Sequence, residues 1–245
     1  LPLNQWLINK LCLTNNNIEK YMKNYAFHEV ANEMYHFIWH EYCDWYIELS
    51  KPSFQNNTRV SEEVKKVAIL LFIEILKMVH PVMPFISEKL WNILTKNQDF
   101  LMNQSFSSLK ELDSYKNSQK NIDHLIEIIS SIRNLRSELN ISYKKKLEIE
   151  ISNSDDQIIK FLKEYEKELS RLLKLDKIVF NSVSSSISKA AYLVVSQTTI
   201  IIPLKEIIDT KSELQKIENK KNKIINELEN IELKLLNTTF IDKAP

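Results

Sequence analysis

Residues 27–52, FHEVANEMYHFIWHEYCDWYIELSKP, contain the side chains of this sequence best suited to metal or nucleophilic chemistry. His36 and His40 are four residues apart, so in a helix they share a face, and Cys43 and Asp44 follow one turn later. Such a set could bind zinc. However, the chain offers no separate ligand pair and no glutamate at the HExxH position, and the surrounding aromatic residues are typical of a core or a partly exposed surface. We therefore expect no metal site.

A nucleophilic pair of Cys43 and His40 is disfavoured as well. The two residues are three apart in one helix, with no third group to orient the histidine and no glycine-built turn to bind an oxyanion. Trp39 and Trp45 could stack on nucleic-acid bases, but large aromatic residues on a bundle helix more often pack in the core. We therefore interpret this run as a helix packed in the centre of a helical bundle, without catalytic residues.

Basic residues form two clusters that could bind the phosphates of a nucleic acid. The first comprises Arg133, Arg136, Lys144, Lys145 and Lys146, and the second comprises Lys216, Lys220, Lys221 and Lys223. Lysine and arginine neutralise backbone phosphates and release their counterions. Adjacent lysines are also common in solvated turns, so this pattern alone leaves both interpretations open.

The absence of glycine excludes several kinds of site. None of the 245 residues is glycine, whereas a phosphate-binding loop or a dinucleotide turn needs glycine where the backbone approaches phosphate or φ is positive. We therefore expect no cofactor to bind this chain. The formal net charge is +1, so any binding to nucleic acid has to come from local clusters.

The apolar runs, the cysteines and the amino-terminal residues predict where the protein is located and whether it is part of a longer chain. The longest apolar run, VAILLFI at 67–73, is far shorter than the ~20 residues of a membrane helix, so no membrane partner is expected. Cys12 and Cys43 fall in helical patterns and are typical of buried thiols in a reducing compartment, which predicts a cytoplasmic location. Without an initiator Met or a signal peptide, the chain is expected to be part of a longer protein.

Helical periodicity dominates the first 140 residues. Apolar residues recur three or four apart over 3–23, 27–51, 61–79, 84–94 and 121–139. We expect Pro52 to end the second helix near Lys51, Ser61 to cap the third and Pro84 to begin the fourth. The third helix is apolar almost all round, so it should lie at the buried centre. Residues 1–140 are thus predicted to form a helical bundle.

A different pattern follows the bundle. Runs rich in β-branched residues predict strands at 147–151, 177–181, 192–196 and 199–204. Together with helical spacing at 155–174, they predict a small α/β subdomain at 141–203.

Residues 204–236, within a predicted arm at 204–245, carry a heptad repeat. Its seam comprises Ile207, Thr210, Leu214, Ile217, Lys221, Ile224, Leu228, Ile231 and Leu235. This pattern fits either a surface helix folded back on the α/β subdomain or a coiled-coil arm whose second helix is missing. We prefer the arm.

Three motifs resemble the carboxy-terminal part of the valyl-tRNA synthetase family. They are the aromatic run at 27–52, then HPVMPFISEKLW at 80–91 and IRNLRSELNIS at 132–142. Their order and spacing fit across essentially the whole chain, and the first two also occur in weaker form in isoleucyl and leucyl enzymes. The ending, IIIPLKEIID, a charged heptad helix and LLNTTFIDKAP, resembles the coiled-coil arm of the family up to its turn. Asn, Ser and Thr stand where the family usually carries glycines.

The resemblance implies a mainly α fold. A class I synthetase anticodon-binding bundle at 1–140 would be followed by the α/β subdomain at 141–203 and by a long coiled-coil helix at 204–245, truncated at its turn. It implies a parent enzyme that attaches valine to tRNA(Val) with ATP and magnesium, in upstream catalytic and editing domains whose HIGH and KMSKS signatures are absent here. This chain would not be catalytic.

The resemblance also implies what this chain binds. It would recognise the anticodon stem and the tRNA body, with the nine basic residues named above as candidate contacts. Its partners would be tRNA(Val), the upstream domains and the missing second arm helix. Alternatives are a protein-interaction module that dimerises through a coiled coil, or the equivalent region of an isoleucyl or leucyl enzyme. A free-standing enzyme is least favoured, because the chain lacks a nucleophile, a metal site and a nucleotide site.

Overall fold

The computed structural model describes residues 1–55, 58–96, 99–106, 115–153, 155–180, 190–204, 218–219, 221–229 and 231–232. The chain divides into two compact units, Leu1–Ile129 with Lys160–Glu168, and Ser130–Ile159 with Leu169–Pro245. The domain bounds predicted at residues 140 and 203 stay a prediction. Among the described helices, none combines the length and apolarity that crossing a lipid bilayer requires.

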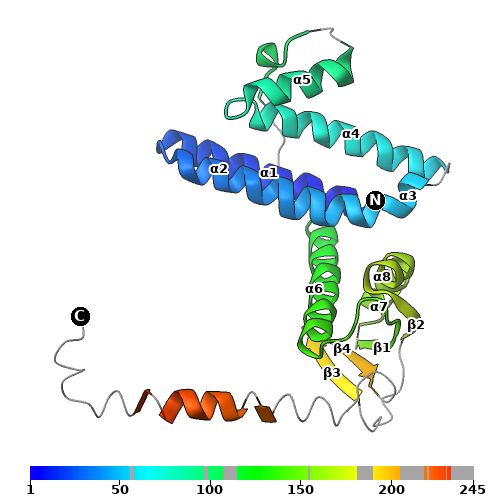
Figure 1. The fold of residues 1–245 in the computed structure, drawn as a ribbon. Helices are drawn as coiled ribbons and strands as arrows, with labels where there is room; N and C mark the ends of the chain where they lie inside the picture. Colours follow the sequence, from blue (N-terminus) through cyan, green and yellow to red (C-terminus); the bar gives the residue numbers. More distant parts are fainter. Residues whose placement is uncertain are drawn as a thin grey trace, which may run out of the picture. The chain divides into compact units, whose positions relative to one another are not determined.

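The first unit is built from helices. They are α1 (Pro2–Lys23), α2 (Phe27–His36), the π-helical segment η1 (Phe37–Ile47), α3 (Glu48–Gln55), α4 (Arg59–Val79), α5 (Pro84–Thr95), the 3-10 turn η2 (Leu101–Asn103), the first part of α6 (Lys116–Glu138), the end of α7 (Asp156–Glu164) and the start of α8 (Glu166–Leu173). α2, η1 and α3 follow one another as a continuous rod (Figure 1). α1 packs along α2 and η1, and α4 packs on α1 and α3. The predicted helical bundle is confirmed.

The bundle core consists of large apolar side chains that recur at helical spacing. Trp6, Leu7 and Leu11 of α1 are buried with Phe37 and Tyr46 of η1. Fully burying such a side chain stabilises the fold by roughly 1.5–3 kcal/mol. The Tyr46 hydroxyl donates a hydrogen bond to Asn4 Oδ1 at 3.1 Å inside the core. The aromatic run therefore supplies part of the core, as its spacing predicts.

Two predicted helix ends are wrong. α3 continues through Pro52 to Gln55, although proline removes one donor and disfavours helix at the preceding residue. Leu49 and Ser50 are buried in this segment, so packing against α4 outweighs that cost. α4 begins at Arg59, with Thr58 rather than Ser61 as its cap: the Thr58 hydroxyl accepts a hydrogen bond from the Ser61 backbone N–H at 3.2 Å. By contrast, Pro84 begins α5 as expected.

α4 is not buried all round, contrary to the prediction. Its inner face, with Val64, Leu71 and Ile75, is buried, while Ile69 and Leu70 are 50% and 61% exposed. Packing on α1, α3 and α5 covers only part of the helix surface. The apolar surface of α4 is therefore larger than the surface that its neighbouring helices cover.

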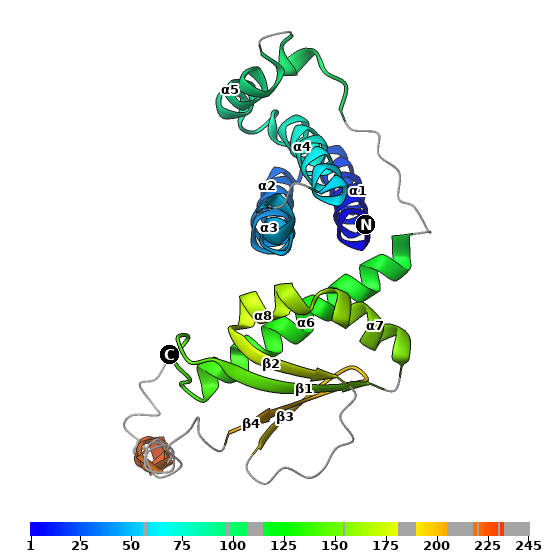
Figure 2. The ribbon, with the colours of Figure 1, turned by 90° about the vertical axis from the view of Figure 1, so that its right-hand side faces the viewer.

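The second unit contains a four-stranded sheet. Its elements are the end of α6, β1 (Leu147–Asn153), the start of α7 (Asp156–Glu164), the end of α8 (Glu166–Leu173), β2 (Leu175–Phe180), β3 (Ala190–Val195) and β4 (Thr198–Pro203). The strand order is β2-β1-β4-β3, with β1 and β2 parallel and the other pairs antiparallel. The four strands are labelled in Figure 2. Alternate residues Leu147, Ile149 and Ile151 are buried, which confirms the period-two pattern of this strand.

Part of the predicted arm can be described. Residues 218–219, 221–229 and 231–232 are helical and exposed. The seam residues Ile224, Leu228 and Ile231 are 54–61% exposed. Seam positions 207, 210, 214, 217 and 235 lie outside the described residues, so the coiled coil stays a prediction.

Candidate nucleic-acid interface

One side of the aromatic run points outward and forms an exposed aromatic face of Tyr35, His36, Trp39 and His40. The Tyr35 and Trp39 side chains are 61% and 52% exposed. Their rings stack with centroids 6.2 Å apart and planes 5° apart, and the ring centroids of His36 and His40 are 5.1 Å apart. The expectation that Trp39 packs in the core is wrong, because Val30, Met34 and Phe37 occupy the buried side.

The candidate metal and nucleophile residues have ordinary surface environments. His40 Nδ1 lies 3.3 Å from Asp44 Oδ2. Within the described ranges, no group of three His, Cys, Asp or Glu residues is placed to hold a metal ion. Desolvation, and secondly the Asp44 carboxylate, raise the pKa of the Cys43 thiol. A raised pKa keeps the sulfur protonated at neutral pH, which disfavours Cys43 as a nucleophile.

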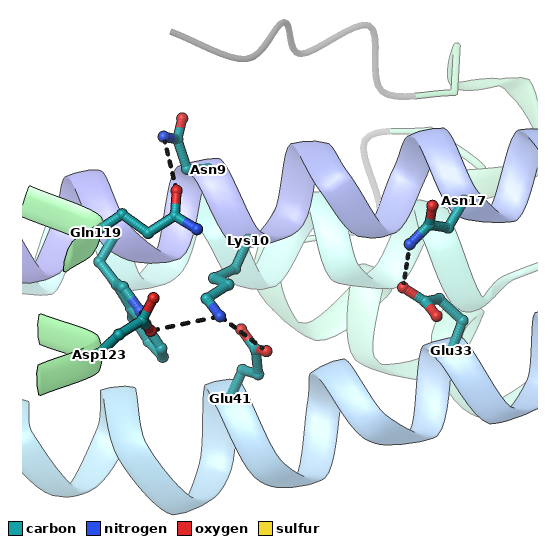
Figure 3. A network of polar contacts seen from close by, with 8 residues as sticks. Asn9, Lys10, Asn17, Glu33, Glu41, Gln119 and Asp123 are labelled. Carbon is teal, nitrogen blue, oxygen red and sulfur yellow. Dashed lines mark hydrogen bonds and ion pairs between the residues drawn. The ribbon is translucent and has the colours of Figure 1, made fainter. Parts of the chain in front are cut away.

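A polar network joins α1, η1 and α6 in the first unit (Figure 3). Lys10 Nζ lies 3.5 Å from Glu41 Oε1 and 3.4 Å from Asp123 Oδ1. Asp123 Oδ1 also accepts a hydrogen bond from Trp6 Nε1 at 2.8 Å, and Asn9 donates to Gln119 Oε1 at 3.4 Å. Desolvation raises the pKa of Glu41, while the Lys10 charge opposes that rise. The network fixes which faces of the three helices meet.

Arg136 organises the turn that carries the predicted lysines. It is 5% exposed. Its Nη1 donates to the Leu173 carbonyl at 2.9 Å, and its Nη2 donates to the carbonyls of Ser142 at 3.1 Å and of Lys145. Burial lowers the pKa of Arg136, yet a guanidinium stays protonated at neutral pH. Arg136 therefore supports this turn from inside, and a direct phosphate contact by Arg136 stays a prediction.

The structure brings a further lysine to this turn. Lys174 Nζ lies 5.7 Å from the ring centroid of Tyr143, which precedes the three predicted lysines. Lys144, Lys145 and Lys146 are exposed, and Lys146 Nζ pairs with Asp176 Oδ1 at 3.1 Å. Sequence reasoning missed Tyr143 and Lys174. The sequence shows that Tyr143 lies within three residues of Lys146, but it does not show that Lys174 approaches the same turn.

The remaining predicted contacts are dispersed. Arg133 is exposed on α6, one turn before Arg136. Lys221 and Lys223 are exposed on the described part of the arm, whereas Lys216 and Lys220 lie outside the described residues. The structure thus groups Lys144, Lys145 and Lys146 with Lys174 in the second unit.

The comparisons with known proteins agree with these features. The family model described as the anticodon-binding domain of tRNA ligase matches residues 4–151, more than half of the chain. The chain therefore belongs to the family of tRNA ligase anticodon-binding domains. Over its whole length it is also similar to valine–tRNA ligases.

The similarity to these ligases extends across distant bacteria. The chain is 34% identical over 251 residues to the valine–tRNA ligase of Legionella pneumophila strain Lens, covering 100% of the chain. It is 30% identical to that of Staphylococcus carnosus strain TM300 and 27% identical to that of Bacillus subtilis strain 168, each over 242 residues and 98% of the chain. The chain spans only 27–28% of the length of these relatives.

These findings confirm the predicted resemblance and the mainly α fold with a small sheet. They do not favour a protein-interaction module unrelated to tRNA ligases.

Proposed function

We propose that this chain is the tRNA-binding, carboxy-terminal part of a valine–tRNA ligase, and that it recognises the anticodon stem and loop and the body of tRNA(Val). The observation that carries this proposal is the similarity of the whole chain to valine–tRNA ligases, together with the anticodon-binding match over 4–151. The parent would join valine to its tRNA with ATP and magnesium in catalytic and editing domains upstream, and would act in the cytoplasm.

Two surfaces would share the recognition of tRNA. Arg133, Lys144, Lys145 and Lys146, and in the arm Lys216, Lys220, Lys221 and Lys223, would contact phosphates, with Arg136 holding the turn that presents three of these lysines. The aromatic face of α2 and η1 would contact bases, because the unpaired bases of an anticodon loop can stack on exposed rings. Phosphate contacts position the RNA, and base contacts distinguish its sequence.

The chain itself should therefore bind tRNA in a salt-dependent way. We expect the 245-residue protein to bind tRNA(Val) transcripts at 50 mM salt. Binding should be weaker at 200 mM salt, because binding releases counterions and added salt opposes that release. A tRNA with a different anticodon should bind more weakly at both concentrations. An affinity that does not change with salt concentration, or equal affinities for both tRNAs, would contradict the proposal.

We also propose that a second helix of the same parent chain covers the seam residues of the arm. Ile224, Leu228 and Ile231 are exposed at a/d spacing on the described part of this helix. The described residues of the arm leave these side chains exposed to water. A partner helix with the same spacing would bury them.

A further inference from the structure

Arg136 holds together two segments that are distant in the sequence. Its guanidinium donates to the carbonyls of Ser142 and Lys145 on one side and to that of Leu173 on the other. The backbone N–H of Leu147 also donates to the Lys174 carbonyl at 3.1 Å. Because charge-assisted hydrogen bonds are stronger than neutral ones, the turn at 142–146 and the turn at Lys174 are fixed to each other.

An exposed ring lies at the junction of these turns. Tyr143 is 61% exposed, and the Lys174 ammonium lies 5.7 Å from its ring centroid. Lys174 has a positive φ of 53°, an uncommon conformation for a residue other than glycine, and it marks the sharp turn between α8 and β2. The ring is thus held beside a cation by backbone that is hydrogen-bonded in place.

The charge around this ring favours an anion. Segments 142–148 and 174–177 contain five lysines and two acids, which are Glu148 and Asp176. Asp176 pairs with Lys146, and Glu148 lies opposite Lys177 in the β1–β2 register. Of these lysines, Lys144 adjoins Tyr143 in the sequence, and Lys174 lies against its ring.

We propose that Tyr143, Lys174 and Lys144 form a binding site for one unpaired nucleotide of RNA. The base stacks on the exposed part of the Tyr143 ring, and its phosphate lies against Lys174 and Lys144. A base in a duplex has its faces covered by its neighbours, so an isolated ring selects a nucleotide that is looped out or single-stranded. This inference rests on the proposed tRNA-binding function and extends it from phosphate contacts to a base contact in the second unit.

The test uses the 245-residue chain and a single-stranded RNA hexamer that contains 2-aminopurine, whose fluorescence is quenched when it stacks. The same hexamer in a duplex serves as the paired probe. All proteins carry Tyr35→Ala and Trp39→Ala, which removes the stacked ring pair of the aromatic face of α2 and η1. Tyr143→Leu removes the ring, Tyr143→Phe keeps it, and Lys174→Gln removes one charge. Tyr192→Leu is the matched control, because Tyr192 is an exposed tyrosine of the same unit.

We expect Tyr143→Leu to weaken hexamer binding by about 5- to 150-fold, as loss of base stacking does, and to abolish the quenching. Tyr143→Phe should retain both, and Tyr192→Leu should change neither. The duplex, whose 2-aminopurine is already stacked on its neighbours, should show no further quenching on binding. Lys174→Gln should reduce the slope of log K against log salt by about 0.7, whereas Tyr143→Leu should leave the slope unchanged.

The outcomes separate this inference from the proposed function. If the chain binds tRNA with the expected salt dependence but Tyr143→Leu binds the hexamer with unchanged affinity and quenching, the nucleotide site is wrong and the proposed function stands. If the unsubstituted chain fails to bind tRNA even at 50 mM salt, the proposed function is wrong. Circular dichroism of each variant verifies folding, and an effect of Tyr143→Phe equal to that of Tyr143→Leu would also overturn the site.

Discussion

Two arginines three residues apart on α6 have different environments. Arg133 is exposed, whereas Arg136 is buried and donates to three backbone carbonyls. A buried guanidinium loses hydration, and these hydrogen bonds compensate for that loss. At the scale of single residues, the same residue type therefore has two roles: Arg136 is structural, and Arg133 is a candidate for binding.

Arg136→Met should lower the free energy of unfolding by about 2–4 kcal/mol, because it removes several charge-assisted hydrogen bonds and leaves carbonyl groups without their donor. Arg133→Met, on the exposed side of the same helix, should change it by no more than about 0.5 kcal/mol. Urea unfolding followed by circular dichroism compares the two variants. Equal effects would contradict the structural role of Arg136.

Lys10 stabilises a desolvated carboxyl group. Desolvation raises the pKa of Glu41 above its ordinary 4.5, and Lys10 is the first of the charges that oppose this rise. Lys10→Met should therefore raise the pKa of Glu41 further. A carboxyl group with a raised pKa in the folded state destabilises the fold increasingly as pH rises from the unfolded pKa through the folded one.

The expected loss is about 1–3 kcal/mol at pH 7 and smaller at pH 4, where Glu41 is more protonated. Urea unfolding of Lys10→Met and the unsubstituted chain at both pH values measures it. Adding Glu41→Gln to Lys10→Met should recover most of the pH-dependent part. A loss that is the same at both pH values would mean that Glu41 is not the group affected.

At the scale of elements, the start of α4 depends on one side chain. Thr58 Oγ1 accepts from the Ser61 backbone N–H at 3.2 Å, which satisfies one of the unpaired donors of the first turn. Ser61 lies inside the helix, where its hydroxyl donates to the Ser53 carbonyl. The first turn of α4 is thus hydrogen-bonded both to Thr58 and to Ser53 of α3.

Thr58→Ala should destabilise the chain by about 1 kcal/mol, because the helix loses its cap. Thr58→Ser keeps a hydroxyl at the same place and should cost less than half of that. Urea unfolding gives the overall loss, and faster hydrogen exchange at the Ser61 amide would locate it. If serine and alanine have equal effects, the hydroxyl is not the cap.

The elements also show how far the sequence could be interpreted. Periodicity predicted the helices, the strand at 147–151 and the proline that begins α5, because each depends on local spacing. It could not decide between Thr58 and Ser61 as a cap. Trp39 was assigned to the core by its residue type, because large aromatic residues on a bundle helix are usually buried, and residue type does not reveal how much of a helix face its neighbours cover.

The candidate site was predictable only in part for the same reason. The lysines at 144–146 are adjacent in the sequence, so their cluster was visible. Lys174 lies beside Tyr143 because the pairing of β1 with β2 and the hydrogen bonds of Arg136 join the turns at 142–145 and 173. That contact is between residues about thirty apart, and no local pattern encodes it.

At the scale of the whole molecule, the exposed seam of the arm remains a hydrophobic stripe on a charged helix. Ile224, Leu228 and Ile231 are each more than half exposed. Burying apolar surface is favourable by roughly 25 cal/mol per Å², so two copies of this chain can substitute for the proposed second helix. Self-association is then a measurable consequence of the a/d spacing.

The chain is expected to self-associate at high concentration, which sedimentation equilibrium detects as an increase in average mass. The double substitution Ile224→Gln with Leu228→Gln should restore a monomer, because it places amides at two consecutive seam positions. Ile225→Gln is the matched control: Ile225 is 42% exposed and adjacent to the seam, so this variant should associate nearly as well as the unsubstituted chain. If the unsubstituted chain is strictly monomeric at high concentration, the stripe is covered by its own fold rather than by a partner helix.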